Sequence, residues 1–338
     1  MDINVPNRLD TSNALDFILA LSKLGEYEEY VFNFEKLDWT PPFGMLLVAN
    51  AINDYRKKRP DSEFVAILGE ENSYPANMGF YKTFGANFGK APGELSGNQR
   101  YLPINIIDTE YFFSQFSKSK NEPGEIIEEE AQKLAIILTQ QNSKSEVVLL
   151  LTYAIREMLR NIFEHSCGSR LAYCGQFYPK TGIAEIAILD NGIGIKKSIE
   201  KNPFLVDINS DVDAINFSLL PGVSGKMYRG IKKDKDNVWQ NSGYGLFVVS
   251  QLCAKDGNFV ICSGSGVVNL RNNQKINLGS SFEGTALCLK LNVEKLSQDK
   301  NVISKIVSNG DELSKEIMGE YQIKASQASK MLRMSIRN

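Results

Sequence analysis

The spacing of apolar residues along the chain changes repeatedly between the two-residue period of strands and the longer period of helices. Pro41 and Pro42 mark the start of one strongly apolar helical run. The elements expected near the N-terminus are strands at 29–34, 63–68 and 101–107 and helices at 43–55 and 75–84. Because strands and helices alternate in this way, residues 1–118 are expected to form a small α/β domain.

A polar, turn-rich stretch at 117–124 precedes a second series of elements. Four glutamates between residues 125 and 130 mark a helix start, and Ser145 is expected to cap the following helix. Further expected elements are strands at 171–177, 183–189, 259–263 and 285–291, a helix at 245–254 and an irregular segment at 196–241. We expect a second α/β domain at 119–295 and a helical C-terminal tail at 296–338.

The helix after Ser145 is apolar on most sides but carries one polar stripe, formed by Glu157, Asn161, Glu164 and His165. Their spacings of three and four residues place these side chains on one face. The amide of Asn161 can supply an oxygen ligand to Mg²⁺, and Glu157, one turn earlier, can act as a general base. Taken alone, the stripe could equally be a solvated helix face.

Asp190 follows an apolar strand and is itself followed by Gly192 and Gly194. A carboxylate at this position can accept a hydrogen bond from an exocyclic amine such as adenine N6. The glycines allow a sharp turn close to a bound base. By itself, however, Asp-Asn-Gly is also an ordinary turn sequence.

A third block, Gly243-Tyr244-Gly245-Leu246, opens the helix expected at 245–254. Glycines at a helix start leave backbone N–H groups directed at a phosphate, although the pattern alone is weak. The three blocks together offer a metal ligand, a base recogniser and a phosphate cradle in one order along the chain. They predict an ATP site with Mg²⁺.

Residues 145–292 resemble the GHKL superfamily of ATPases and kinases, which includes gyrase, the heat-shock chaperone ATPase, histidine kinases and mismatch-repair ATPases. The resemblance implies the Bergerat fold, a left-handed α/β sandwich. It also implies a catalytic role for Glu157 and a mobile lid at 196–242, in which Ser224-Gly225-Lys226 brings Lys226 to the γ-phosphate. The nucleotide-binding residues that it implies are Asn161 (also the Mg²⁺ ligand), Asp190, Gly192, Gly194, Lys226, Gly243, Tyr244, Gly245, Leu246 and Thr285.

Within that superfamily, His165 and Gly245-Leu246-Phe247 are more similar to histidine kinases and anti-sigma serine kinases than to gyrase. Phe247 stands where many histidine kinases have a further glycine, so their phosphate contacts do not transfer as a set. A histidine kinase needs an acceptor histidine outside this domain, and the chain has only His165. Autophosphorylation on histidine is therefore not expected. For His165 itself, a structural role beside the nucleotide and direct catalysis both remain open.

The N-terminal domain resembles the STAS fold of anti-sigma antagonists, because a strand is followed by the segment 37–44 and then by an apolar helix. In the phosphorylated antagonists, a serine or threonine lies beside the glycine at that helix start. Pro42 and Phe43 occupy these places, and Thr40 is displaced. The resemblance implies a docking or dimerisation unit without a phosphorylation switch.

Composition narrows the class of protein further. The 338 residues carry a formal net charge of −2 and 43% hydrophobic residues, which argues against disorder and against a generally nucleic-acid-binding surface. Five cysteines without a Cys-x-x-Cys pair are expected to be reduced thiols rather than zinc ligands. With no signal peptide and no membrane span in the sequence, a cytoplasmic, soluble protein is expected. Only a basic stretch near the C-terminus leaves a local nucleic-acid contact open, through Lys324, Lys330, Arg333 and Arg337.

These patterns predict a slow, Mg²⁺-dependent ATPase that serves as a nucleotide-controlled switch for a protein partner or for self-association. One alternative is a protein serine/threonine kinase of the anti-sigma type, acting on a separate partner protein. A binding module that holds ATP without turning it over is the third possibility. The presence of both Glu157 and Asn161 argues against that last alternative.

Overall fold

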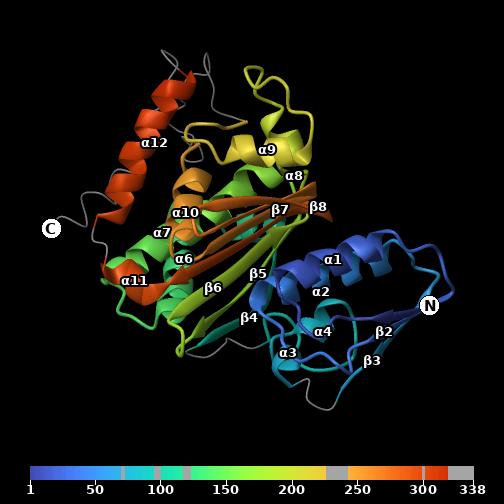
Figure 1. Cartoon of the computed structure of the whole chain (residues 1–338). Helices are drawn as coiled ribbons and strands as arrows, with labels where there is room; N and C mark the ends of the chain where they lie inside the picture. The colour runs from blue at the N-terminus through green and yellow to red at the C-terminus, as the bar shows by residue number, and fades with distance from the viewer. Residues whose placement is uncertain (70–72, 95–99, 117–122, 226–242, 299–300, 319–338) are drawn as a thin grey trace.

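The protein is a mixed α/β structure built on two β-sheets (Figure 1). The computed structural model describes residues 1–69, 73–94, 100–116, 123–225, 243–298 and 301–318. One sheet has three parallel strands and the other has five antiparallel strands. The mixed α/β class expected from the hydrophobic pattern is therefore confirmed.

The three-stranded sheet belongs to the N-terminal part of the chain and has the order β1-β2-β3. Its strands are β1 Asp2–Asn4, β2 Glu29–Asn33 and β3 Glu63–Ile67, and its helices are α1 Thr11–Ser22, α2 Pro42–Lys57, α3 Ser73–Asn77 and α4 Phe80–Thr83. Parallel strands need crossover connections, and α1 and α2 provide them. Asp10 caps α1 by accepting a hydrogen bond from the backbone of Asn13 at 3.1 Å.

The larger sheet has the strand order β4-β5-β6-β8-β7. Its strands are β4 Tyr101–Asp108, β5 Arg170–Tyr178, β6 Ile183–Asp190, β7 Asn258–Arg271 and β8 Gln274–Asn292. The helices of this part are α5 Thr109–Phe116, α6 Pro123–Thr139, α7 Glu146–Asn161, α8 Gly194–Ile199, α9 Asp211–Ser218, α10 Gly245–Ala254, α11 Val293–Gln298 and α12 Val302–Met318, with a π-helical turn, η1, at Ile162–Ser166. Ser145 caps α7 through a 3.3 Å bond from the backbone of Val148, as its sequence predicts.

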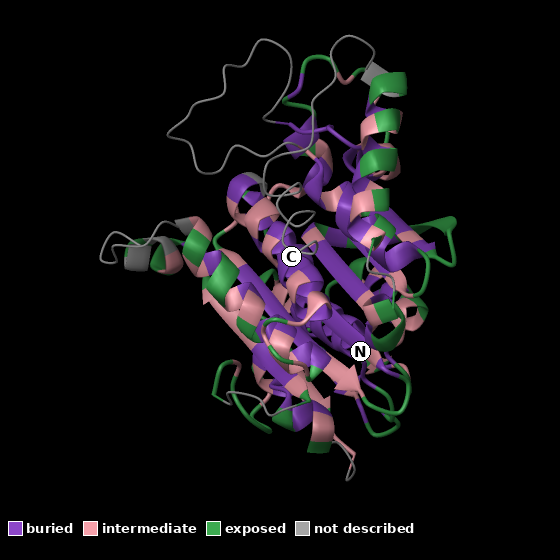
Figure 2. Cartoon of the chain, turned by 90° about the vertical axis from the view of Figure 1, so that its left-hand side faces the viewer, coloured by how far each residue is buried: buried purple, intermediate pink, exposed green. Residues whose placement is uncertain are grey.

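Both faces of the larger sheet are buried (Figure 2). Helices α6, α7 and α10 pack on one face, whereas α1 and α2 of the N-terminal part pack on the other. Strand β6 shows this clearly, since Ile186 and Ile188 enter the first core and Ala187 and Leu189 enter the second. A strand covered on both faces has an almost continuous hydrophobic sequence, as β6 does.

The strand expected to complete the N-terminal domain, at residues 101–107, joins the larger sheet instead. β4 pairs antiparallel with β5, from Tyr101 opposite Gln176 to Asp108 opposite Arg170. Leu102 of this strand enters the first core and Ile104 enters the second, and the register with β5 shifts between Leu102 and Asn105. Its sequence predicts a strand but contains nothing that selects between two sheets, because the pairing partner lies about 70 residues away along the chain.

Three other expectations need correction. The single helix expected at 75–84 is two short helices, broken at Gly79, whose φ of +84° suits glycine. The segment 196–241 was expected to be irregular, but its described part contains most of α8 and all of α9. Helix α9 begins with a capping box formed by Ser210 and Asp213, which its sequence could have revealed. Strands β7 and β8 are far longer than expected.

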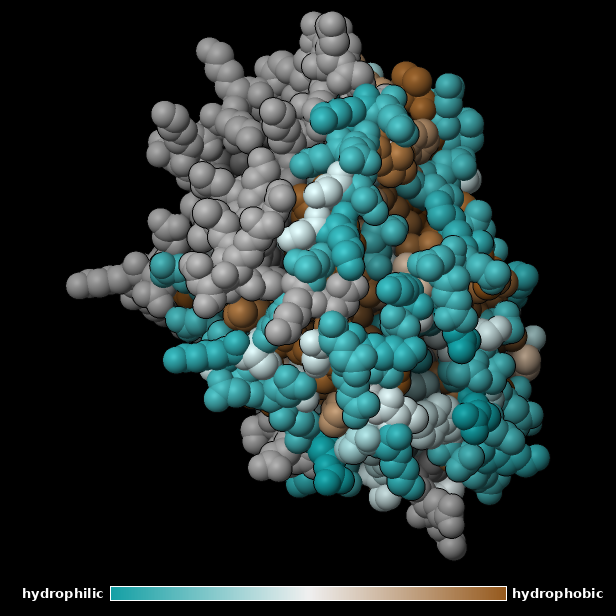
Figure 3. All heavy atoms as spheres, turned by 60° about the vertical axis from the view of Figure 1, so that its left-hand side comes forward, coloured by the Kyte–Doolittle hydropathy of each residue, from teal (hydrophilic) through white to brown (hydrophobic). Residues whose placement is uncertain are grey.

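The surface and the helices were compared with what the composition predicts. On the face shown in Figure 3, hydrophobic side chains occupy a narrow band among hydrophilic ones in the described part of the surface. Within the described residues, no helix combines the length and the apolar character needed to cross a membrane. The basic residues near the C-terminus lie outside the described part of the chain.

Candidate functional site

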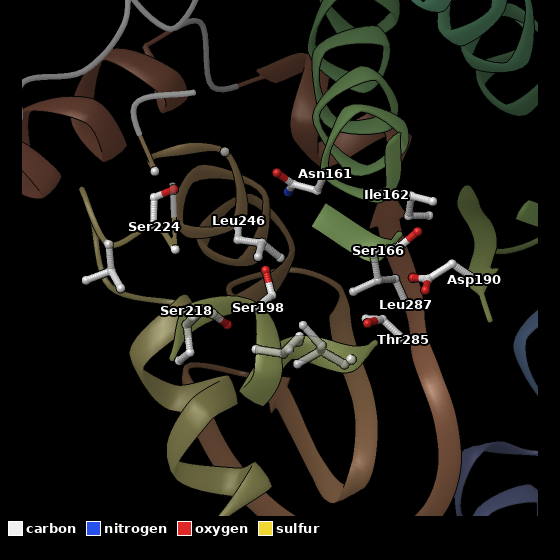
Figure 4. A pocket seen from close by; sticks show the side chains of 18 residues that line it. Asn161, Ile162, Ser166, Asp190, Ser198, Ser218, Ser224, Leu246, Thr285 and Leu287 are labelled. Carbon is white, nitrogen blue, oxygen red and sulfur yellow. The ribbon is translucent and has the colours of Figure 1, made fainter. Parts of the chain in front are cut away.

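A pocket of about 730 Å³, counted out to its open mouth, lies where the end of α7 and the starts of α8 and α10 meet the sheet (Figure 4). Seven residues of the predicted nucleotide site line it, namely Asn161, Asp190, Gly194, Gly243, Gly245, Leu246 and Thr285. The structure therefore brings together parts of the three blocks, which span 161–246, and Thr285, which follows them in the sequence.

Asp190 ends strand β6 in the wall of the pocket, and only 1% of its surface is exposed. Its register partner on β8 is Thr285, and the two side chains lie close together in Figure 4. Burial raises the pKa of Asp190 to about 7, although hydrogen bonds from Gly192 and Thr285 oppose the rise. The bond from the Gly192 amide is 2.6 Å long. The pocket thus contains a desolvated carboxyl group, for which a donor on a ligand would be a favourable partner.

Glycines shape the backbone around Asp190. A β-carbon at Gly192 would overlap the carbonyl oxygen of Ser166, and one at Gly284 would overlap that of Asp190. Gly194 starts α8 with a φ of +77°. Gly192 itself does not line the pocket. Its role in the structure is to let the loop after β6 pack against the π-helical turn.

The start of α10 forms another side of the pocket. Gly243 has a φ of +72°, and its carbonyl accepts a 3.2 Å bond from the amide of Gly222. The first N–H groups of α10 have no partner inside the helix, as at any helix start. Tyr244 lies between the two pocket-lining glycines but is fully buried and does not line the pocket. The sequence therefore located this turn, but not the direction of its tyrosine.

Glu157 lies beside the pocket without lining it. Only 3% of its surface is exposed, and Oε1 accepts a 2.9 Å hydrogen bond from the guanidinium of Arg156. Arg156 also donates to Glu128 of α6 at 3.1 Å, which links α6 to α7. The other oxygen faces the start of α10, because a β-carbon at Gly245 would be 2.5 Å from Oε2. The expected base is thus an ion-paired carboxylate that lies against the turn at the start of α10.

The expected polar stripe does not continue as a regular α-helix. α7 ends at Asn161, and the next five residues form the π-helical turn. Glu164 in this turn is paired with Arg160 at 2.6 Å. The side chain of His165 is outside the described part of the structure. π-Helical turns are rare and often occur at functional sites, and this one carries Ser166 into the pocket wall.

Several pocket residues carried no signal in the sequence. The hydroxyl-bearing residues missed by sequence analysis are Ser166, Ser198 and Ser218. Ser263 of β7 does not line the pocket, but it supports the pocket wall: it donates to the carbonyl of Gly284 at 2.8 Å and accepts from the backbone amide of Ile195 at 3.0 Å. Serines occur in many kinds of structure, so only the tertiary structure separates the serines of the pocket from the other serines of the chain.

The segment Ser224-Gly225-Lys226 is described only in part. Ser224 and Gly225 line the pocket, and the side-chain amide of Asn202 donates to the Ser224 carbonyl at 2.9 Å. Lys226, which is expected to contact the γ-phosphate, lies outside the described residues.

In comparisons with family models, with curated proteins and with solved structures, the chain gave no match.

Proposed function

We propose that the pocket binds ATP with Mg²⁺ and that residues 145–292 form an ATP-binding unit of the GHKL type. The observation that carries the proposal is the buried carboxyl of Asp190 in the wall of the pocket that the predicted residues share. A buried acceptor of this kind favours a ligand that donates a hydrogen bond at that point, as the amine of adenine does. Leu246, Ile261 and Leu287 supply apolar surface in the same pocket, which suits a flat base.

The opposite side of the pocket suits the phosphates. Gly243 and Gly245 line this side, and α10 offers its first N–H groups. Among the described residues, no group of three or more His, Cys, Asp or Glu side chains is placed to hold a metal ion. Asn161 fits Mg²⁺ nonetheless, because this ion keeps several waters and takes one or two protein oxygens together with phosphate oxygens. When bound, Mg²⁺ would neutralise phosphate charge.

Glu157 is the proposed general base, and Arg156 accounts for the slow turnover that we propose. The carboxylate is paired with Arg156 and is outside the pocket lining, so it must turn towards the pocket before it accepts a proton from water. A slow ATPase is suited to a switch whose product is a conformational state. Parts of the proposed lid that are described, including Ser198 and Ser224, already form pocket wall.

The N-terminal part is proposed to be STAS-like and to act as a docking unit. In support, α2 begins at Pro42 and packs on β5 and β6, so its start faces the larger sheet rather than solvent. We further propose a cytoplasmic location, because all five cysteines are free thiols and four of them are buried.

Two measurements test the proposal. Calorimetric titration of the full chain with ATP, ADP and GTP in Mg²⁺ should show preferential binding of the adenine nucleotides, and absence of ATP binding at millimolar concentration would refute it. Incubation with γ-labelled ATP then distinguishes the activities. Free labelled phosphate indicates an ATPase, label on a protein partner indicates the kinase alternative, and neither product indicates a non-hydrolysing switch.

A further inference from the structure

The C-terminal helix α12 lies along α10, the helix whose first residues border the pocket (Figure 1). The side of α12 that faces inward is formed by buried residues at positions 303, 307, 310 and 314. Gly310 lies against the ring of Phe247, because a β-carbon there would be 2.6 Å from Cε1 of the ring. The absence of a side chain at Gly310 therefore permits this close approach of the two helices.

A side-chain hydrogen bond joins α12 to the turn at the start of α10. The hydroxyl of Tyr244 donates to Oδ1 of Asp311 at 2.9 Å. Tyr244 has no exposed surface, and burial raises its pKa to about 12, so the hydroxyl keeps its proton in the physiological range. Asp311 belongs to α12, which follows Tyr244 by more than 50 residues in the chain.

Tyr244 lies in a turn that contacts the pocket on one side and α12 on the other. Its neighbours Gly243 and Gly245 line the pocket, whereas its own side chain reaches away from the pocket to α12. A turn with two glycines is costly to order, because glycine loses more conformational freedom than any other residue. Contact with α12 favours one conformation of this turn, so it offsets part of that cost.

We propose that α12 and the ligand pocket are positively coupled through Tyr244, so that docking of α12 strengthens nucleotide binding and nucleotide binding strengthens docking of α12. This inference rests on the proposed function, since it takes the ligand to be ATP. A ligand that needs the ordered turn binds more weakly when the turn is ordered only part of the time. By linkage, the effect of each event on the other is equal. Occupancy of the pocket by nucleotide then changes how firmly the C-terminal helix α12 is docked.

The test compares wild type with Tyr244→Phe, which removes the hydroxyl and keeps the buried ring. Tyr173→Phe is the control, because the Tyr173 hydroxyl also donates to a carboxylate at 2.9 Å, that of Glu130, and accepts from Asn105, both away from the pocket. The dissociation constant for Mg-ATP is measured by calorimetry. Amide hydrogen exchange of residues 243–254 and 302–318 is followed with and without ATP. Thermal unfolding of all three proteins shows whether the fold is equally stable.

Tyr244→Phe should weaken ATP binding by about two- to tenfold, the range of one lost hydrogen bond, and Tyr173→Phe should not. ATP should slow exchange in 302–318 of wild type but not of Tyr244→Phe. Without ligand, Tyr244→Phe should speed exchange in both segments together. If wild type binds ATP and Tyr244→Phe matches it in affinity and exchange, the coupling is refuted while the proposed function stands. If wild type binds no ATP, the proposed function fails. Faster amide exchange of both segments in Tyr244→Phe without ligand would then still show that Tyr244 couples them, and unchanged exchange would show that it does not.

Discussion

The carboxylate of Glu185 accepts a hydrogen bond from the backbone amide of Phe43 at 3.1 Å, although the two residues are 142 positions apart. Phe43 is in the first turn of α2, where Pro41 provides no side-chain cap. Glu185 therefore acts as the cap of α2 from the neighbouring sheet. Lys290 pairs with its other oxygen at 3.1 Å, so this buried carboxylate joins the N-terminal part to two strands of the larger sheet.

Replacing Glu185 by alanine should lower the free energy of unfolding by about 3–5 kcal/mol, because the Phe43 amide and Lys290 lose their partner in a buried interface. Glu185→Gln should cost less, since its amide oxygen can still accept from Phe43. Denaturant unfolding measures both. The control is Glu283→Ala, which removes an exposed pair with Lys58 and should cost less than about 1 kcal/mol. Equal losses in the three variants would show that Glu185 is not a specific link.

Gly192→Ala should be destabilising, because the new methyl group would overlap the carbonyl oxygen of Ser166 and force the loop after β6 away from the π-helical turn. Overpacking of this kind costs about 1–3 kcal/mol. Gly279→Ala is the matched control, since a β-carbon at Gly279 meets no atom within 4 Å. The difference in unfolding midpoint between the two variants decides the point, and equal midpoints would contradict the packing argument.

Asp190→Asn should weaken ATP binding by about 1–3 kcal/mol, because the amide can present a donor where adenine also donates. In wild type, GTP should bind poorly for the related reason that guanine presents a carbonyl at that position. Calorimetry with both nucleotides measures this, with Asp54→Asn, on α2 and outside the pocket lining, as the control. Equal affinities of wild type for ATP and GTP would remove Asp190 from base recognition.

Asp190 should also make stability depend on pH. Its pKa is raised from 3.8 to about 7 by burial, so the folded protein binds this proton more tightly than the unfolded chain does. The stabilisation is complete below pH 4 and is lost as the pH rises through about 7. Between pH 5 and 8, wild type should lose about 2–3 kcal/mol of unfolding free energy relative to Asp190→Asn. If the unfolding free energies of the two proteins change with pH in the same way, folding does not raise the pKa of the Asp190 carboxyl.

Glu157→Gln and Asn161→Ala should fail in different ways. Loss of the base should reduce phosphate release by about 10²- to 10⁴-fold and leave Mg-ATP affinity intact. Loss of the amide should weaken Mg²⁺-dependent binding as well as turnover. Affinity and phosphate release are measured for both variants. Glu164→Gln serves as the control, since Glu164 is paired with Arg160 in the following turn. If hydrolysis survives in Glu157→Gln and fails in Glu164→Gln, then Glu164 is the base.

Features that depend on a few neighbouring residues were predictable from the sequence. They include the Ser145 cap, the almost continuous hydrophobic run of β6, and the start of α10 between residues 243 and 246. Each depends on backbone freedom, on a side chain within three positions, or on a local period of apolar residues. The order of the three blocks predicted which residues would meet, and six of their residues line one pocket together with Thr285.

Contacts between distant residues were decided by the tertiary structure. The sequence did not reveal that β4 joins the larger sheet, that Arg156 holds Glu157 outside the pocket lining, or that Tyr244 reaches α12. These outcomes depend on which surfaces are brought together when both faces of one sheet are buried. Strand pairing and ion pairing across such distances are set by the packing of the whole chain, since no local pattern distinguishes one remote partner from another.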